Sequence, residues 1–175
     1  MTDFKIDMNP YQPLSTAFTN HSLVSLNSDG SFFHALCAAY SLPYIQEKIG
    51  NMSINRQQFI TNLKSQLALK LVNYDLLDKK DKTELRDALQ SDGSIDSKFD
   101  KYIGDLMDKD VYVLDGKTRD VKEGIVRKRE SVILLDLGKK YKLVGRIKDN
   151  QIQTIFTSDD DLIDSLKERQ KELKV

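Results

Sequence analysis

The most informative segment of the chain reads Asn27-Ser28-Asp29-Gly30-Ser31-Phe32-Phe33-His34-Ala35-Leu36. Asp29 and Gly30 favour the open or left-handed backbone of a sharp turn, and Asp29 or Ser31 can cap a helix that begins near Phe32. A helix start is the positive end of the helix dipole, where a cysteine would have a lowered pKa and free N–H groups could bind an oxyanion. The chain has Phe32 at this point, and a benzyl side chain can only fill space. The segment therefore predicts the turn and helix of a nucleophile site without its nucleophile.

These residues resemble the nucleophile motif of the ovarian-tumour (OTU) cysteine proteases, most of which remove ubiquitin, and whose motif reads roughly Asp-Gly-x-Cys-(apolar)-Phe-x-Ala. The resemblance is strongest to the OTU-like proteins of large DNA viruses, whose version reads Asp-Gly-Ser-Cys-Phe-Phe-His-Ala. This chain has Asp29-Gly30-Ser31 followed by Phe32-Phe33-His34-Ala35. Either the cysteine alone is deleted or Phe32 stands in its place, and neither alignment supplies a thiol.

The second half of the resemblance lies near the C-terminus, where the family has a buried strand, a glycine turn and then His-Tyr-(acid)-Leu-Val-Gly. Here Ser131–Leu137 reads as the strand and Gly138 as the turn, and Lys140-Tyr141-Lys142-Leu143-Val144-Gly145 follows. Lys140 stands where the resemblance places the general base, and Lys142 where it places the acidic neighbour. A lysine near its normal pKa is protonated at neutral pH and cannot accept a proton from a thiol.

The resemblance extends over about residues 22–166, because 109–115, 151–156 and the acidic pair Asp159-Asp160 also look like the viral proteins. It implies a single-domain α+β fold of the OTU-like type, within the papain-like cysteine protease superfamily, with helices packed on a small, mostly antiparallel sheet. It also implies a degenerate site at Asp29, Gly30, Ser31, Phe32, Lys140, Tyr141 and Lys142.

Cys37 is the only cysteine of the chain, and it offers an alternative nucleophile. His34 lies three residues before it, so a helix would place both on one face. Cys37 also belongs to an apolar helical stripe, in which it would be a small core residue without a dipole end to lower its pKa. His21 is a second candidate base or a loop residue. One cysteine and two histidines form no recognisable zinc spacing, so we expect neither a metal nor a cofactor.

Composition describes an ordinary single domain of 175 residues, long enough to bury a core. Lys plus Arg equals Asp plus Glu at 27 each, so no overall field attracts nucleic acid or a membrane. Basic residues do cluster at 117–148, either as a surface for nucleic acid or an acidic partner, or as the solvated face of a hairpin. A single cysteine fits a reducing compartment, and no long apolar run is present, so we expect a cytoplasmic protein.

The sequence pattern divides the chain into an N-terminal arm, 1–20, and an OTU-like domain, 21–175. The arm carries two prolines and three aromatic residues without periodicity, and it either packs on its own domain or docks on a neighbour. Helices are predicted over 31–41, 55–72, 78–90, 97–107 and 159–174, with Pro43 breaking the first and Gly50 as a C-cap. Strands are predicted over 22–27, 111–115, 131–137, 141–147 and 151–156, which is an α+β layout.

A lost catalytic centre on this fold predicts a non-enzymatic binding or structural protein. The viral resemblance implies a virus-encoded component of a virion or its assembly, located in the host cytoplasm or the virion. Its expected partners are viral structural proteins or a ubiquitin-like protein. Two alternatives remain open at this point: an active deubiquitinating cysteine protease that uses Cys37 with His34 or His21, and a ubiquitin-binding module without turnover.

Overall fold

The computed structural model describes residues 7–13, 23–27, 31–40, 48–91, 95–118, 120–122, 125–138, 140–149 and 151–173. His21 and the predicted turn residues Asp29 and Gly30 lie outside these ranges. Within the described ranges, no helix combines the length and the apolar character that crossing a membrane requires.

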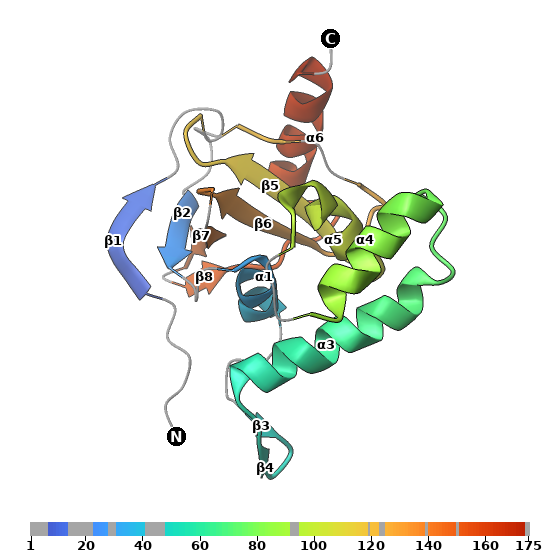
Figure 1. The fold of residues 1–175 in the computed structure, drawn as a ribbon. Helices are drawn as coiled ribbons and strands as arrows, with labels where there is room; N and C mark the ends of the chain where they lie inside the picture. The colour runs from blue at the N-terminus through green and yellow to red at the C-terminus, as the bar shows by residue number, and fades with distance from the viewer. Residues whose placement is uncertain are drawn as a thin grey trace.

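A single mixed sheet forms the centre of the fold (Figure 1). Its strands lie in the order β1 (Asp7–Pro13), β2 (Leu23–Asn27), β7 (Tyr141–Lys148), β6 (Ser131–Asp136) and β5 (Asp110–Asp115), and β8 (Gln151–Gln153) pairs with the end of β7. Every pairing is antiparallel except that of β5 with β6, which is parallel. The mostly antiparallel sheet confirms the predicted fold class.

Helices cover both faces of this sheet (Figure 1). One face packs against α1 (Phe32–Tyr40), α3 (Arg56–Leu71), α4 (Lys79–Leu89), the short 3-10 helix η2 (Ser97–Phe99) and α5 (Asp100–Leu106). The other face packs against α6 (Asp161–Leu173). The segment 159–174 was predicted as one helix, and α6 occupies most of it.

The two faces arise from the alternation of apolar residues along the buried strands. In β6, Val132 and Leu134 contribute to the core beneath α1, α3, α4 and α5. Ile133 and Leu135 point to the other side and join Leu162 of α6 in a second core. A strand that is buried on both faces reads as a continuous apolar run, because successive side chains point in opposite directions. Each fully buried side chain of this size stabilises the fold by about 1.5–3 kcal/mol.

Two local elements differ from the sequence prediction. Residues 7–13 of the arm form β1, which pairs with β2 at the edge of the sheet, so this part of the arm packs on its own domain. The prolines argued against a strand in the sequence, because proline has no N–H group to donate to a neighbouring strand. An edge strand tolerates proline, since one of its sides has no partner strand. Gly50, expected to cap a helix, instead has a φ of +60° in the turn between β3 (Lys48–Ile49) and β4 (Met52–Ser53).

Candidate functional site

A cavity of about 650 Å³ lies where the N-terminus of α1 meets α3, η2, α5 and the turn between β6 and β7. Its apolar walls come from Phe32 and Phe33 on α1, Ile60 on α3 and Ile103 on α5. Its polar lining comes from the side chains Ser31, His34, Gln57, Lys64, Ser97, Asp100 and Tyr141. A volume of several hundred Å³ with a few convergent polar groups is typical of a ligand site.

Ser31 and Phe32 form the start of α1, as the sequence predicts. The Ser31 hydroxyl oxygen accepts a hydrogen bond from the His34 amide at 3.2 Å, which is the contact of a helix cap. Phe32 is buried, and its ring packs edge to face on Phe33, with ring centroids 6.0 Å apart. Phe32 therefore forms part of the cavity wall beside the helix start and presents no polar atom there.

Tyr141, the first residue of β7, packs against Phe32 in the cavity wall. The two rings meet edge to face with centroids 5.4 Å apart. The Tyr141 hydroxyl donates a short hydrogen bond to Asp100 Oδ2 at the start of α5. Burial is the largest cause that raises the pKa of Asp100 to about 7, against the opposing effect of this hydrogen bond. Burial and the bond to Asp100 also raise the pKa of Tyr141.

The two lysines of the second motif lie elsewhere. Lys140 precedes β7 and is exposed, and Lys142 is half-buried opposite Leu135 of β6. Neither lines the cavity. Side chains alternate along β7, so Tyr141 joins the core beneath α1 while Lys142 points away from it. Of the segment 140–142, Tyr141 is the residue that the structure brings to Phe32.

Cys37 lies in the apolar core, with 1% of its surface exposed. Burial raises the pKa of its thiol to about 12, so the thiolate that a nucleophile requires is scarce at neutral pH. His34 lines the cavity and Cys37 does not. The structure therefore places the alternative nucleophile outside the candidate site, and His21 lies outside the described residues.

Asp100 is the site residue that sequence reasoning missed. It stands in the predicted helix 97–107, where an acidic residue in the first turn reads as a favourable partner of the helix dipole. Its pairing with Tyr141 joins positions 41 residues apart. No local pattern carries that signal, because the contact exists only once α5 packs against the sheet.

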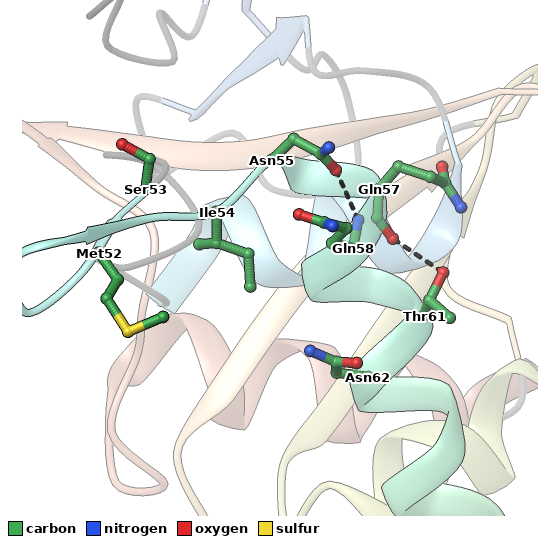
Figure 2. A pocket seen from close by; sticks show the side chains of 8 residues that line it. All are labelled: Met52, Ser53, Ile54, Asn55, Gln57, Gln58, Thr61 and Asn62. Carbon is green, nitrogen blue, oxygen red and sulfur yellow. Dashed lines mark hydrogen bonds between the residues drawn. The ribbon is translucent and has the colours of Figure 1, made fainter.

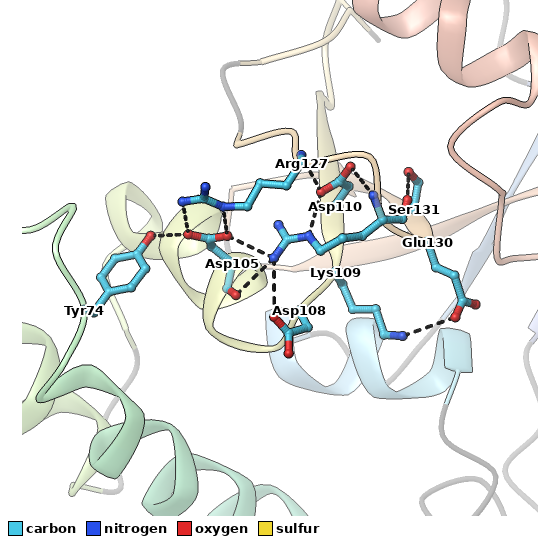
Figure 3. Close-up of polar contacts among 9 residues, drawn as sticks. Tyr74, Asp105, Asp108, Lys109, Asp110, Arg127, Glu130 and Ser131 are labelled. Atoms are coloured by element: carbon cyan, nitrogen blue, oxygen red, sulfur yellow. Dashed lines mark hydrogen bonds and ion pairs between the residues drawn. The ribbon is translucent and has the colours of Figure 1, made fainter.

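Among the described basic residues of 117–148, Lys122, Arg127, Arg129 and Arg146 are paired with carboxylates, and Figure 3 shows one such cluster. Arg127 and Arg129 both bind Asp105, and Arg129 Nε also donates to Asp110 Oδ1 at 2.9 Å. Burial would raise the pKa of Asp105, but the hydrogen bonds from Arg127 and Tyr74 and both guanidinium charges hold it below its usual range. These contacts secure residues 125–130, which return the chain to β6 beside its parallel partner β5.

Two further pairs extend this arrangement to other parts of the sheet. Arg146 of β7 binds Asp160 ahead of α6 with a shortest distance of 2.7 Å. Lys122 binds Asp136 of β6 at 2.8 Å. These pairs hold loops and helices to the sheet, and they engage four of the basic residues of 117–148 within the protein.

A second cavity, of about 550 Å³, lies between the hairpin β3–β4 and the N-terminus of α3 (Figure 2). Asn55 caps α3 there, because its side chain accepts a hydrogen bond from the Gln58 amide at 2.7 Å. The lining residues are apolar, hydroxyl or amide side chains, and none of them titrates near neutral pH. This cavity can contribute contacts but no acid–base chemistry.

Within the described part of the chain, no group of three or more His, Cys, Asp and Glu side chains is placed to hold a metal ion. The chemistry available in the first cavity is therefore that of one buried carboxyl, one phenol, one imidazole and one ammonium among apolar walls. Such a set can bind polar or charged groups of a ligand. The nucleophile–base contact of a cysteine hydrolase is not among the contacts described there.

Comparison with solved structures finds the OTU fold. An OTU domain solved in complex with ubiquitin superposes with a TM-score of 0.55 and 14% sequence identity, over 86% of this chain and 84% of that chain. The protein therefore has an OTU-like fold. No family model matches the chain. No curated protein matches it in a sequence search either.

Proposed function

We propose that this OTU-like domain is a non-enzymatic binding protein whose candidate site takes up part of a protein partner. The observation that carries the proposal is the contact between Phe32 and Tyr141 at the start of α1, backed by the bond from Tyr141 to Asp100. The resemblance places a thiol at the helix start and an imidazole at the start of the following strand. An aromatic ring at the first position and a hydrogen-bonded phenol beside it leave a shaped cavity without an activated nucleophile.

The alternative of an active deubiquitinating protease requires Cys37 to act as nucleophile. Its burial and raised pKa argue against that role, because the thiol has neither access to a substrate nor a neighbouring positive charge to ionise it. Lys140, at the position that the resemblance gives to the base, is exposed. We therefore favour binding without turnover.

A ubiquitin-like protein is the first partner to test. Support comes from the fold, since an OTU domain of similar structure has been solved in complex with ubiquitin. Fold similarity alone does not establish a shared partner, so the site must be tested directly. The resemblance of the sequence to OTU-like proteins of large DNA viruses supports a second proposal. In that proposal the protein is virus-encoded, serves in the virion or its assembly, and binds viral structural proteins in the host cytoplasm or the particle.

One experiment separates turnover from binding. The purified protein is titrated with ubiquitin while backbone amide chemical shifts are followed, and in parallel it is incubated with a fluorogenic ubiquitin conjugate and with a ubiquitin-derived electrophilic probe. We expect saturable shifts around residues 31–36 and 140–142, no hydrolysis and no adduct on Cys37. Hydrolysis that disappears in Cys37→Ser would overturn the proposal. An absence of shifts at every ubiquitin concentration would exclude ubiquitin as the partner.

A further inference from the structure

The carboxyl of Asp100 is an acceptor that the fold leaves only partly satisfied. Among the described residues, the Tyr141 hydroxyl donates a hydrogen bond to Oδ2 of this carboxyl. A carboxylate can accept about four hydrogen bonds, and a buried acceptor without donors loses stability. Asp100 lines the 650 Å³ cavity on one side and a smaller cavity of about 270 Å³ on the other. Its remaining acceptor capacity is thus next to space that a ligand can enter.

The walls around this carboxyl suit a long, slender, cationic side chain. Phe32, Phe33 and Tyr141 provide aromatic surface, and Ile60 and Ile103 provide aliphatic surface for methylene groups. An ammonium group already lies against this surface, because Lys64 Nζ is 5.8 Å from the centroid of the Phe33 ring. Aromatic rings attract cations at such distances, and a carboxylate at the end of an apolar cavity adds a charged hydrogen-bond acceptor.

We propose that the cavity binds a primary ammonium group on an unbranched aliphatic chain, the chemistry of a lysine side chain, with Asp100 as its acceptor. The methylene groups lie between Phe32 and the isoleucines, and the ammonium donates to Asp100 beside the Tyr141 hydroxyl. The inference rests on the proposed function in one respect: a protein partner presents the lysine. Lys64 also lines the cavity, so the Asp100 carboxylate must outweigh the repulsion between the Lys64 ammonium and that of the ligand.

A proton competes with this ligand for Asp100. Because the pKa of Asp100 is about 7, the carboxyl is mostly neutral at pH 6 and mostly ionised at pH 8. Four charged or titratable groups act on Asp100 electrostatically, namely Tyr141, Asp136, Asp96 and Lys122. Two more, His34 and Lys64, line the same cavity. Histidine ordinarily titrates in the same range, so His34 needs its own control. Ammonium binding should strengthen about tenfold from pH 6 to pH 8, in proportion to the ionised carboxyl.

The test uses Nα-acetyl-lysine methylamide as the ligand, with the norleucine and arginine analogues as matched comparisons. Binding is followed by amide chemical shifts of the full chain at pH 6 and pH 8. We expect saturable shifts at Phe32, Asp100 and Tyr141 with the lysine compound, with about tenfold tighter binding at pH 8. We expect at least tenfold weaker binding of the norleucine compound at pH 8. Equal binding of norleucine, tighter binding of arginine, or affinity that falls as pH rises would overturn the proposal.

Variants identify the acceptor. Asp100→Asn should weaken lysine binding at least tenfold at pH 8 and remove its pH dependence, whereas Asp87→Asn on the exposed side of α4 should change neither. In His34→Gln, the affinity for the lysine compound should still rise between pH 6 and pH 8. Tyr141→Phe removes a hydrogen bond that lowers the pKa of Asp100, so the rise should move to higher pH. This variant keeps the proposal testable if Asp100→Asn does not fold. Unchanged pH profiles in both site variants would refute the role of Asp100.

The same compounds distinguish failure of this inference from failure of the proposed function. Lysine binding at Asp100 without any response to ubiquitin would retain the ammonium site and reject ubiquitin as its source. Ubiquitin shifts around 31–36 and 140–142 that persist unchanged in Asp100→Asn would retain the binding function and reject the ammonium site.

Discussion

The rings of Phe32 and Tyr141 pack edge to face across the junction of α1 and β7, with their centroids 5.4 Å apart. Edge-to-face pairs of this kind contribute about 0.5–1.5 kcal/mol beyond the area they bury. The contact joins the start of α1 to the start of β7, and it fixes the wall of the cavity in which Asp100 lies.

Placing a thiol at position 32 should therefore not create a hydrolase. In Phe32→Cys, the residue opposite is still Tyr141, whose hydroxyl is engaged with Asp100 and is no base at neutral pH. We expect no cleavage of a fluorogenic ubiquitin conjugate, and a loss of about 3 kcal/mol of unfolding free energy from the lost aromatic packing. Phe32→Leu, which keeps most of the volume, is the stability control. Measurable turnover by Phe32→Cys would contradict this account of the site.

Asp100 should make the stability of the protein fall as pH rises from about 4 to about 7. Its pKa is raised to about 7 in the folded state, so the folded protein binds a proton that the unfolded chain has released in this interval. The contribution is present below the unfolded pKa and is lost as pH passes through 7. Asn cannot ionise, so Asp100→Asn does not undergo this loss. The difference in unfolding free energy between Asp100→Asn and wild type should shift in favour of the variant by on the order of 3 kcal/mol between pH 4 and pH 8.

Urea unfolding of both proteins at several pH values measures this difference. Asp87→Asn is the matched control, because that carboxyl is exposed on α4 and should follow wild type throughout. Parallel curves for wild type and Asp100→Asn would mean that the pKa of Asp100 is the same in the folded and unfolded states.

Cys37 should react very slowly in the native protein. A pKa raised to about 12 by burial, against an ordinary value of 9.0, lowers the thiolate fraction at pH 7.5 about a thousandfold. Alkylation by iodoacetamide, followed by mass spectrometry, should therefore be undetectable over an hour and complete within minutes in denaturant. Rapid native labelling, or labelling that ubiquitin blocks, would show an accessible thiol and revive the protease alternative.

The carboxylate of Asp105 should be among the most important charged groups for stability. Its side chain is 4% exposed, and it accepts from Arg127 Nε at 2.6 Å and from the Tyr74 hydroxyl at 2.7 Å. Asp105→Ala leaves the Arg127 guanidinium and the Tyr74 phenol without this acceptor, whereas Arg129 keeps Asp110, and the change should cost about 3–5 kcal/mol of unfolding free energy. Thermal unfolding measures this loss, with Asp87→Ala, which is exposed on α4, as the control. A loss below about 1 kcal/mol would mean that residues 125–130 are held by other contacts.

The sign of its pH dependence is opposite to that of Asp100. The pKa of Asp105 is lowered in the folded state, so its contribution is present above the unfolded value near 4 and is lost as pH falls through the folded value. Between pH 5 and pH 2, wild type should lose more stability than Asp105→Ala does.

Much of the fold could be predicted because it depends on short-range patterns. Continuous apolar runs such as Ser131–Asp136 identify strands that are buried on both faces, and Asn55 marks the start of α3 through its contact with the amide three residues later. The edge strand Asp7–Pro13 could not be predicted, because its pairing depends on β2 and its prolines argue against a strand. Of the candidate site residues named from the sequence, Ser31, Phe32 and Tyr141 line the cavity, whereas Lys140 and Lys142 do not.

The amino-acid order alone specifies that the helix start carries Phe32, and that the single cysteine falls inside an apolar helical stripe. Both statements follow from residue identity and helical spacing, which are local properties. The pairing of Asp100 with Tyr141, and hence the titration of a buried carboxyl near pH 7, required the packed protein. Burial and long-range contact set that pKa, and these arise only when the start of α5 meets the start of β7 and both groups are buried.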